Sequence, residues 1–130
     1  MASLTAPSGR VFDSLPIDSR AGFPQSFSVL LAGVNYSFHL YVNVPAAKIV
    51  KRDEIFDLPS QDTFLVVSVD RLHQDAGPET IFLRKVVPSI EYVAGPLLLY
   101  FPQQRVAAAS LNGQGDAGSN VVGGVAQRWA

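Results

Sequence analysis

SFSVLLAGVNYSFHLYVN, residues 26–43, is the stretch of this sequence that decides its fold. In both of its halves apolar residues alternate with mostly polar ones, which is the period of a β-strand with one buried face. Gly33 and Val34 stand between the halves, and a glycine in the first position favours the type II′ turn of a two-residue loop. The stretch therefore predicts an antiparallel β-hairpin.

The predicted turn also fixes the register of the hairpin. One face then holds three apolar pairs: Leu31 with Tyr36, Val29 with Phe38, and Phe27 with Leu40. The opposite face is mostly polar and pairs Ser28 with His39 and Ser26 with Tyr41. A slip of one residue would mix the two faces, so the turn and the apolar pattern favour the same pairing.

Short runs rich in valine, phenylalanine and tyrosine recur along the rest of the chain between turn residues, which is typical of strands. They predict strands at 63–70, 80–87 and 96–101 and an extended lead-in at 11–17. The run up to Val69 is almost continuously apolar, so we expect it to be buried on both faces. Residues 49–58 are ambiguous, because Lys51-Arg52-Asp53-Glu54 is also compatible with a short helical turn. The fold class predicted is all-β: a small antiparallel β-sandwich or barrel-like domain with flexible termini.

Composition divides the chain into an N-terminal arm (1–10), a β domain (11–105) and a Gly/Ala-rich tail (106–130). Half of the ten glycines lie between Gly113 and Gly124, so the tail has little bulk to bury and we expect it to be flexible. Trp129 stands next to Arg128 at its tip and is a candidate anchor for a neighbouring subunit. The arm lacks the basic and apolar regions of a secretory signal, so we expect the cytoplasm or a particle assembled there.

The overall composition excludes several classes of protein. The chain has 130 residues, 48% of them hydrophobic, which fits one domain and rules out a chain disordered throughout. Ten basic residues against eleven acidic ones give a formal net charge of −1. We therefore expect no nucleic-acid partner and no basic patch for an anionic membrane. No apolar run reaches the roughly 18 residues of a spanning helix, so we expect no membrane insertion. Without cysteine, disulfides, thiolate metal sites and cysteine catalysis are excluded.

Two motifs match sites for cofactors or metals only in part. Residues 113–118 match G-x-G-x-x-G, but only twelve residues follow, too few for the βαβ unit of a dinucleotide site. His73 stands near Asp70 and Asp75, but a closed metal site needs three or four ligands. We expect no cofactor and no metal site.

The densest acidic group of the chain consists of Asp53, Glu54, Asp57 and Asp62. Paired carboxylates can serve as acid and base when one of them is desolvated. Lys51 and Arg52 adjoin this group, which indicates a solvated loop with ion pairs instead.

The hairpin matches a known motif, Gln-x-Phe-x-Val-x-Leu-x-Gly-x-x-Tyr, which is followed by an alternating strand that ends near an asparagine. Seven residues stand at the positions of this motif: Gln25, Phe27, Val29, Leu31, Gly33, Tyr36 and Asn43. They follow a short Leu-Pro-Ile lead-in at 15–17. In this pattern the chain resembles the small baseplate plug proteins of contractile-tailed bacteriophages. Leu99-Tyr100 resembles the terminal strand of that family. After Asn43 the chain departs from the family pattern, because residues 44–49 stand where the family usually has a tryptophan and an aspartate-containing strand.

The resemblance implies a non-enzymatic structural protein of the tail baseplate, β-rich and present in multiple copies. It implies packing against hub, spike or tube proteins, and a place in the virion after assembly in the host cytoplasm. The candidate partner-binding residues are Arg128 and Trp129 in the tail and His39 and Tyr41 on the polar face of the hairpin.

Two other classes of function stay open. A ligand-binding β module, for example one that binds carbohydrate, would use exposed Tyr41 and Tyr92 as a stacking platform. A small hydrolase would use Ser28 and His39. The hydrolase also needs an orienting group and an oxyanion hole, and no G-x-S-x-G motif is present.

Overall fold

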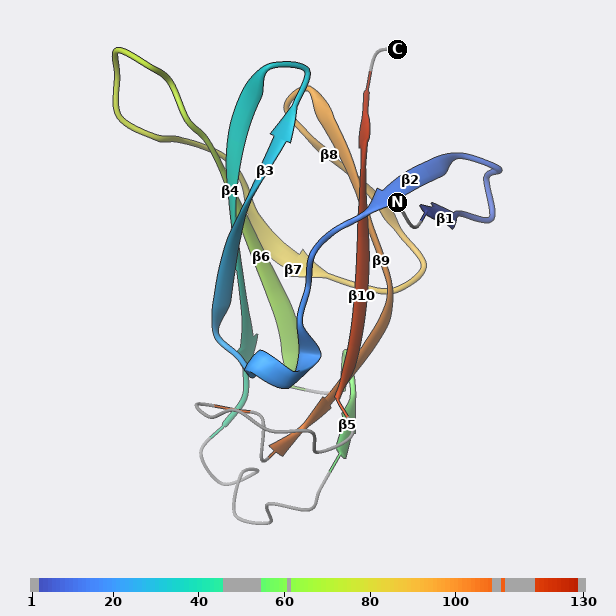
Figure 1. Ribbon diagram of the computed structural model, residues 1–130. Coiled ribbons are helices and arrows are strands. Elements are labelled where there is room, and N and C mark those ends of the chain that lie inside the picture. The colour runs from blue at the N-terminus through green and yellow to red at the C-terminus, as the bar shows by residue number, and fades with distance from the viewer. Residues whose placement is uncertain (1–2, 46–54, 61, 109–110, 112–118, 129–130) are drawn as a thin grey trace.

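Two antiparallel β-sheets, packed face to face, make up the fold (Figure 1). The computed structural model describes residues 3–45, 55–60, 62–108, 111 and 119–128. One turn of 3₁₀ helix, η1 (Ser19–Ala21), precedes the hairpin. The strands are β1 (Ser3–Thr5), β2 (Val11–Ser14), β3 (Gln25–Leu31), β4 (Val34–Asn43), β5 (Ile55–Asp57), β6 (Phe64–Arg71), β7 (Glu79–Val86), β8 (Glu91–Ala94), β9 (Leu97–Ala107) and β10 (Asn120–Gln127).

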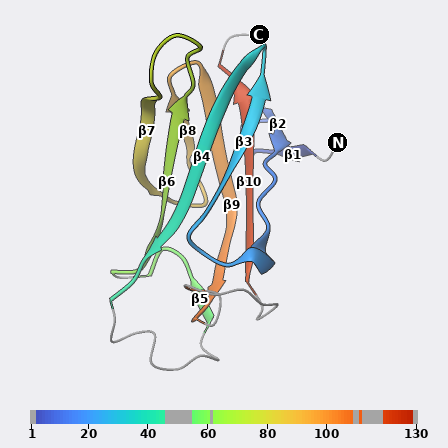
Figure 2. The same ribbon diagram turned by 60° about the vertical axis from the view of Figure 1, so that its left-hand side comes forward.

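The four-stranded sheet has the order β3-β4-β6-β7, so β3 and β7 are its edges. The other sheet has the order β1-β2-β10-β9, and both β8 and β5 pair with the remaining side of β9. Figure 2 shows the two layers, with the four-stranded sheet lying over β9 and β10. The expected all-β antiparallel fold is confirmed, and of the two forms considered it is the sandwich.

The core lies between the two sheets, and each long strand contributes alternate residues to it. Fully buried residues from the four-stranded sheet include Phe38, Leu40, Leu65 and Val67, and those from the six-stranded sheet include Leu99, Phe101 and Val106. A smaller cluster on the other face of β9 joins Tyr100 to Phe12, whose ring centroids are 5.5 Å apart. Residues 97–101 of β9 are therefore buried on both faces.

The predicted hairpin forms, but its predicted register is wrong. The loop is Ala32-Gly33 rather than Gly33-Val34, and Leu31 pairs with Val34. Both loop residues have positive φ, 49° and 79°, as a type I′ turn requires. The register differs by two residues, so each side chain keeps its predicted face while its partner changes. The observed pairs include Val29 with Tyr36, Phe27 with Phe38, Ser28 with Ser37, and Ser26 with His39.

The expectation of flexible termini is wrong for the described parts of both. Within the predicted arm, residues 3–5 form β1, which pairs with β2. Within the predicted tail, Val106 and Ala107 end β9 and are buried, and β10 lies between β2 and β9. The β domain therefore extends beyond the predicted bounds 11–105 in both directions.

Glycines explain why a segment with so little bulk forms an inner strand. A Cβ on Gly123 would lie 2.5 Å from Cδ1 of Phe101, and a Cβ on Gly124 would lie 2.7 Å from Cβ of Phe12. Phe101 and Phe12 belong to the two strands that flank β10. Their large side chains occupy the space that the glycines leave, so neighbours far away in sequence supply the bulk that β10 lacks.

The strands predicted at 63–70 and 80–87 are confirmed as β6 and β7, each displaced by one residue. On β6, Val66 is only 6% exposed although its neighbours Leu65 and Val67 point to the core, so both faces are buried there. The lead-in predicted at 11–17 is β2 over its first four residues. Of the ambiguous segment 49–58, the part 55–57 is β5, and Lys51-Arg52-Asp53-Glu54 lies outside the described residues.

β9 continues to Ala107, past the predicted end at Phe101, although Pro102 favours a strand end. β10 pairs Val122 with Gln103 and Gly124 with Tyr100. Phe101 and Pro102 therefore lie opposite Gly123 alone, which is a β-bulge. In a bulge the missing N–H of proline removes no ladder hydrogen bond.

Candidate functional site

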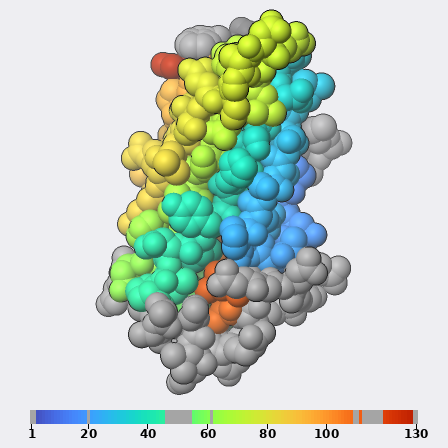
Figure 3. Space-filling view, turned by 90° about the vertical axis from the view of Figure 1, so that its left-hand side faces the viewer, coloured from blue at the N-terminus to red at the C-terminus, as the bar shows by residue number. Residues whose placement is uncertain are grey.

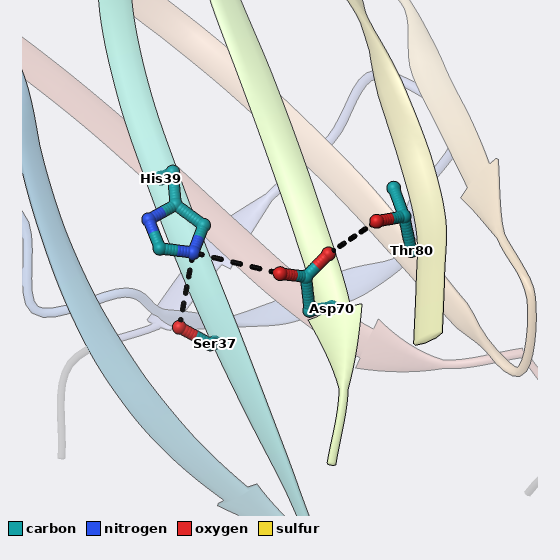
Figure 4. Close-up of polar contacts among 4 residues, drawn as sticks. All are labelled: Ser37, His39, Asp70 and Thr80. Carbon is teal, nitrogen blue, oxygen red and sulfur yellow. Dashed lines mark hydrogen bonds and ion pairs between the residues drawn. The ribbon is translucent and has the colours of Figure 1, made fainter. Parts of the chain in front are cut away.

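A row of polar side chains crosses the outer face of the four-stranded sheet, which Figure 3 views directly. Ser37 and His39 are two residues apart on β4 and so share this face. Asp70 of β6 pairs with Ser37, and Thr80 of β7 pairs with Asp70. We call Ser37, His39, Asp70 and Thr80 the polar cluster (Figure 4).

His39 contacts two members of the polar cluster through the same ring nitrogen. Its Nε2 lies 3.2 Å from Ser37 Oγ and 3.7 Å from Asp70 Oδ2. Thr80 Oγ1 donates a hydrogen bond of 2.7 Å to the other carboxylate oxygen, Asp70 Oδ1. Figure 4 shows both dashed lines of His39 leaving from one nitrogen.

This arrangement differs from a Ser-His-Asp triad. In a triad one histidine nitrogen takes the serine proton while the other donates to the aspartate, which orients the ring. In the polar cluster Ser37 and Asp70 share Nε2, so the carboxylate does not hold the ring for proton transfer from Ser37. The side chains of His39 and Asp70 are 47% and 21% exposed, and ion pairs this accessible to water stabilise a protein by at most about 1 kcal/mol. The cluster offers donors and acceptors to a polar ligand.

Tyr41 extends this surface toward the start of β3. It is 41% exposed and stands two residues from His39 on the same face of β4. Beside it lies a hollow of about 210 Å³, lined by Pro24, Gln25, Ser26, His39, Leu40 and Tyr41. His39 and Tyr41, both predicted to bind partners, thus lie on one open surface, and their role in binding stays a prediction.

Tyr92, the other residue of the predicted stacking platform, is buried, and its prediction as an exposed residue is wrong. It is 5% exposed and packs edge-on against Phe82 at 5.8 Å between ring centroids. Its hydroxyl accepts a 2.8 Å hydrogen bond from Val87 N–H, and Arg84 lies 5.0 Å from its ring centroid. Pairing of β8 with β9 turns Tyr92 and Ala94 toward the core, so no second tyrosine joins Tyr41.

The predicted pair of Ser28 and His39 is also wrong, because the observed register pairs Ser28 with Ser37. His73 contacts Glu79 instead of the aspartates near it in sequence, with 2.9 Å between Nε2 and Oε1. Among the described residues no three histidine, aspartate or glutamate side chains come together as a metal site.

Of the other candidate residues from the sequence, some lie within the described part of the chain and some lie outside it. Asp57 pairs with Arg105 of β9, with 2.9 Å between Oδ1 and Nε. The backbone N–H of Arg128 donates to the carbonyl of Pro96 at 2.9 Å. Asp53, Glu54, Trp129 and the glycine motif at 113–118 lie outside the described residues.

The sequence patterns did not indicate a groove that runs beside β3, between the two sheets. Its volume is about 450 Å³. Its lining is apolar at Pro16, Val29, Leu30, Leu31 and Val125 and polar at Asp13, Ser14 and Ser28. We call it the β3 groove. The one feature of the sequence that could have pointed to an uncharged surface at β3 is the stretch from Ala21 to Ala47, which contains no aspartate, glutamate, lysine or arginine.

Comparisons of the chain with protein-family models, with curated proteins and with solved structures find no significant match. Within the described part of the chain, no helix is long and apolar enough to cross a membrane. The evidence for its function therefore lies in its own surfaces and in the hairpin motif.

Proposed function

We propose that this protein is a structural, non-enzymatic subunit of the baseplate of a contractile phage tail. It is a plug-like component that packs in several copies against hub, spike or tube proteins. Assembly takes place in the host cytoplasm, and the subunit is then part of the virion. The observation that carries the proposal is the apolar surface left open beside β3, where Leu30 is 65% exposed and borders the β3 groove. Exposed apolar patches of this kind favour contact with another protein.

The residues that resemble the plug proteins support the proposal, because they have clear roles in building the hairpin. Phe27, Val29 and Leu31 pack against the core, and Gly33 occupies the turn with a φ of 79°. The side-chain amide of Gln25 donates to the carbonyls of Asp18 and Gly22, both at 2.8 Å. Its side-chain oxygen accepts from Asp18 N–H at 3.1 Å. The motif thus specifies both the hairpin and the lead-in to it.

Immunogold labelling of phage-like particles from the source lysate tests this proposal. We expect an antibody raised against the folded protein to label the tail tip of disrupted particles, and antibody pre-adsorbed with the protein to give no label. Protein found only free in the soluble fraction, with no labelled particle, would contradict it.

A ligand-binding module is the second candidate, favoured by Tyr41 and the hollow of about 210 Å³ beside it. An exposed tyrosine next to polar side chains can stack on a sugar ring. A glycan array distinguishes this candidate from the first. Binding that Tyr41→Ala removes would favour it, provided that Leu83→Ala, at the 62% exposed residue on β7, has no effect. The baseplate proposal predicts no such binding.

A further inference from the structure

Among the described strands, β3 is an open edge of the four-stranded sheet, because it pairs with β4 on one side and with none of them on the other. In a hairpin with a two-residue loop, the pair next to the loop exchanges both hydrogen bonds, and such pairs alternate along the ladder. Leu31 and Val34 form that pair, so Ser26, Ser28 and Leu30 direct their backbone groups away from β4. The carbonyl of Asn35, opposite Leu30, agrees with this alternation, because it accepts from Leu72 N–H at 2.9 Å on the β6 side.

β3 lacks the features that protect the other edge strands from pairing with a strand of another chain. Charges, bulges and short length are the usual means of protection. β7 carries Glu79, Arg84 and Lys85 and pairs with β6 through a bulge. β1 and β5 have three residues each and β8 has four. β3 has seven residues, none of them charged or proline, and pairs without irregularity.

An apolar groove runs along this open edge. The β3 groove has a volume of about 450 Å³, and an adjoining hollow of about 330 Å³ shares Asp13, Leu31 and Val125 with it. A strand added to β3 would direct every second side chain toward the groove and the others toward solvent. Backbone pairing and apolar pockets together are the two elements of peptide recognition by strand addition.

A second copy of β3 does not fit this site. Its inward side chains, Phe27, Val29 and Leu31, already pack against the core of their own sandwich. Two β3 strands could pair edge to edge, but neither would place a side chain in the groove of the other. The occupant must be an extended segment whose apolar face is not yet buried.

The charges at the β3 groove add one requirement for the segment that binds there. Asp13 lines both the groove and the adjoining hollow, and within the described residues no cation pairs with it. Arg10 lines the hollow too, but it pairs with Glu91, with 3.4 Å between Nε and Oε1. A basic residue on the occupant would compensate Asp13.

We propose that the open edge of β3 and the β3 groove bind an extended peptide segment of another protein by antiparallel strand addition. The segment alternates apolar with polar residues and carries a lysine or arginine that meets Asp13. This inference does not rest on the baseplate proposal, because such a segment would bind the free protein in any assembly.

The probe is the blocked, fluorescein-labelled peptide KTVTVTV, in which the lysine lies on the same face as the valines and so toward Asp13, titrated by fluorescence anisotropy. Its valines would enter the groove, and its threonine amides would bond to Ser26, Ser28 and Leu30. We expect methylation of the threonine amide nitrogens to abolish binding of the peptide. Methylation of the valine amide nitrogens should leave the binding unchanged. Saturable binding at concentrations up to about 1 mM is the expected result, a range typical of weak peptide recognition. No binding in that range, or equal sensitivity to both methylations, would overturn the proposal.

Two exposed leucines give a matched pair of variants. Leu30→Lys adds a charge to the β3 edge, and we expect it to weaken binding by about tenfold or more. Leu83→Lys adds the same charge to β7 at a residue with similar exposure, 62% against 65%, and should leave binding unchanged. Asp13→Asn should weaken binding of the lysine peptide but not of the peptide with norleucine in its place. Equal loss in the two leucine variants would overturn the proposal, and circular dichroism verifies that both are folded.

Amide hydrogen exchange of the free protein is a test that needs no peptide. We expect fast exchange at Ser26, Ser28 and Leu30 and slow exchange at Phe27 and Val29, with the first three becoming protected when the peptide binds. Protection of those three without peptide would mean that the edge is already occupied, by this chain or by a second copy, and would contradict the proposal.

Discussion

The backbone of Gly123 on β10 lies directly against the ring of Phe101 on β9. A Cβ on Gly123 would be 2.5 Å from Cδ1 and 2.6 Å from Cε1 of that ring, and 3.1 Å from Cδ1 of Ile17. Phe101 is fully buried in the core between the two sheets. We therefore predict that Gly123→Ala lowers the free energy of unfolding by about 2 to 3 kcal/mol, the usual cost of overpacking a core. Urea denaturation followed by circular dichroism measures it.

Gly77 provides the control for this substitution, because a Cβ there would have no atom within 4 Å. We expect Gly77→Ala to change the free energy of unfolding by less than about 0.5 kcal/mol. If both variants were equally stable, β10 would not pack against β9 as described.

The turn of the hairpin gives a prediction of opposite sign. Ala32 has a φ of 49°, a left-handed conformation that costs an L-residue roughly 1 to 2 kcal/mol and that asparagine adopts more readily. Ala32→Asn should therefore raise the free energy of unfolding by about 0.5 to 1 kcal/mol, and the β-branched Ala32→Val should lower it. Thermal unfolding of the parent protein and the two variants compares their stabilities. With the loop at Gly33-Val34 instead, Ala32 would be a strand residue and valine would stabilise it.

Much of the hairpin could be predicted from the sequence because strand faces repeat every two residues. A register that differs by two leaves Phe27, Val29 and Leu31 on the buried face, so the apolar pattern alone does not distinguish the two loops. What distinguishes them is the backbone conformation of Ala32, and alanine carries no preference for positive φ. The faces were therefore predictable and the partners across them were not.

β10 could not be predicted because its packing depends on residues distant in the chain. Local composition describes small side chains, whereas Phe12 and Phe101 provide the surface that covers Gly123 and Gly124. The candidate site could be predicted only in part for the same reason. The polar face with His39 and Tyr41 follows from alternation along β4, but the approach of Asp70 depends on the pairing of β4 with β6.

Tyr92 tests the distinction between a core tyrosine and a surface one. Its hydroxyl is the acceptor for Val87 N–H at 2.8 Å in a partly buried place. Tyr92→Phe removes that acceptor, and we expect the free energy of unfolding to fall by about 1 kcal/mol. Tyr41 is 41% exposed, so Tyr41→Phe should change it by less than about 0.5 kcal/mol. Guanidinium chloride denaturation of both variants gives the comparison, and equal effects would contradict the burial of Tyr92.

β4 presents the polar cluster on one face and the core on the other, which allows a test of both within three consecutive residues. Phe38 is fully buried, and we predict that Phe38→Ala lowers the free energy of unfolding by about 3 to 5 kcal/mol. Ser37→Ala and His39→Ala remove exposed contacts through Nε2, and each should change it by less than about 1 kcal/mol.

The same variants test the chemistry of the polar cluster. Because Ser37 and Asp70 share one nitrogen of His39, Asp70 does not orient the imidazole through its other nitrogen, as the aspartate of a triad does. We predict that hydrolysis of p-nitrophenyl acetate proceeds at the same rate with the parent protein, Ser37→Ala and His39→Ala. A rate that falls by more than about tenfold in both folded variants would show that the two side chains act together as nucleophile and base.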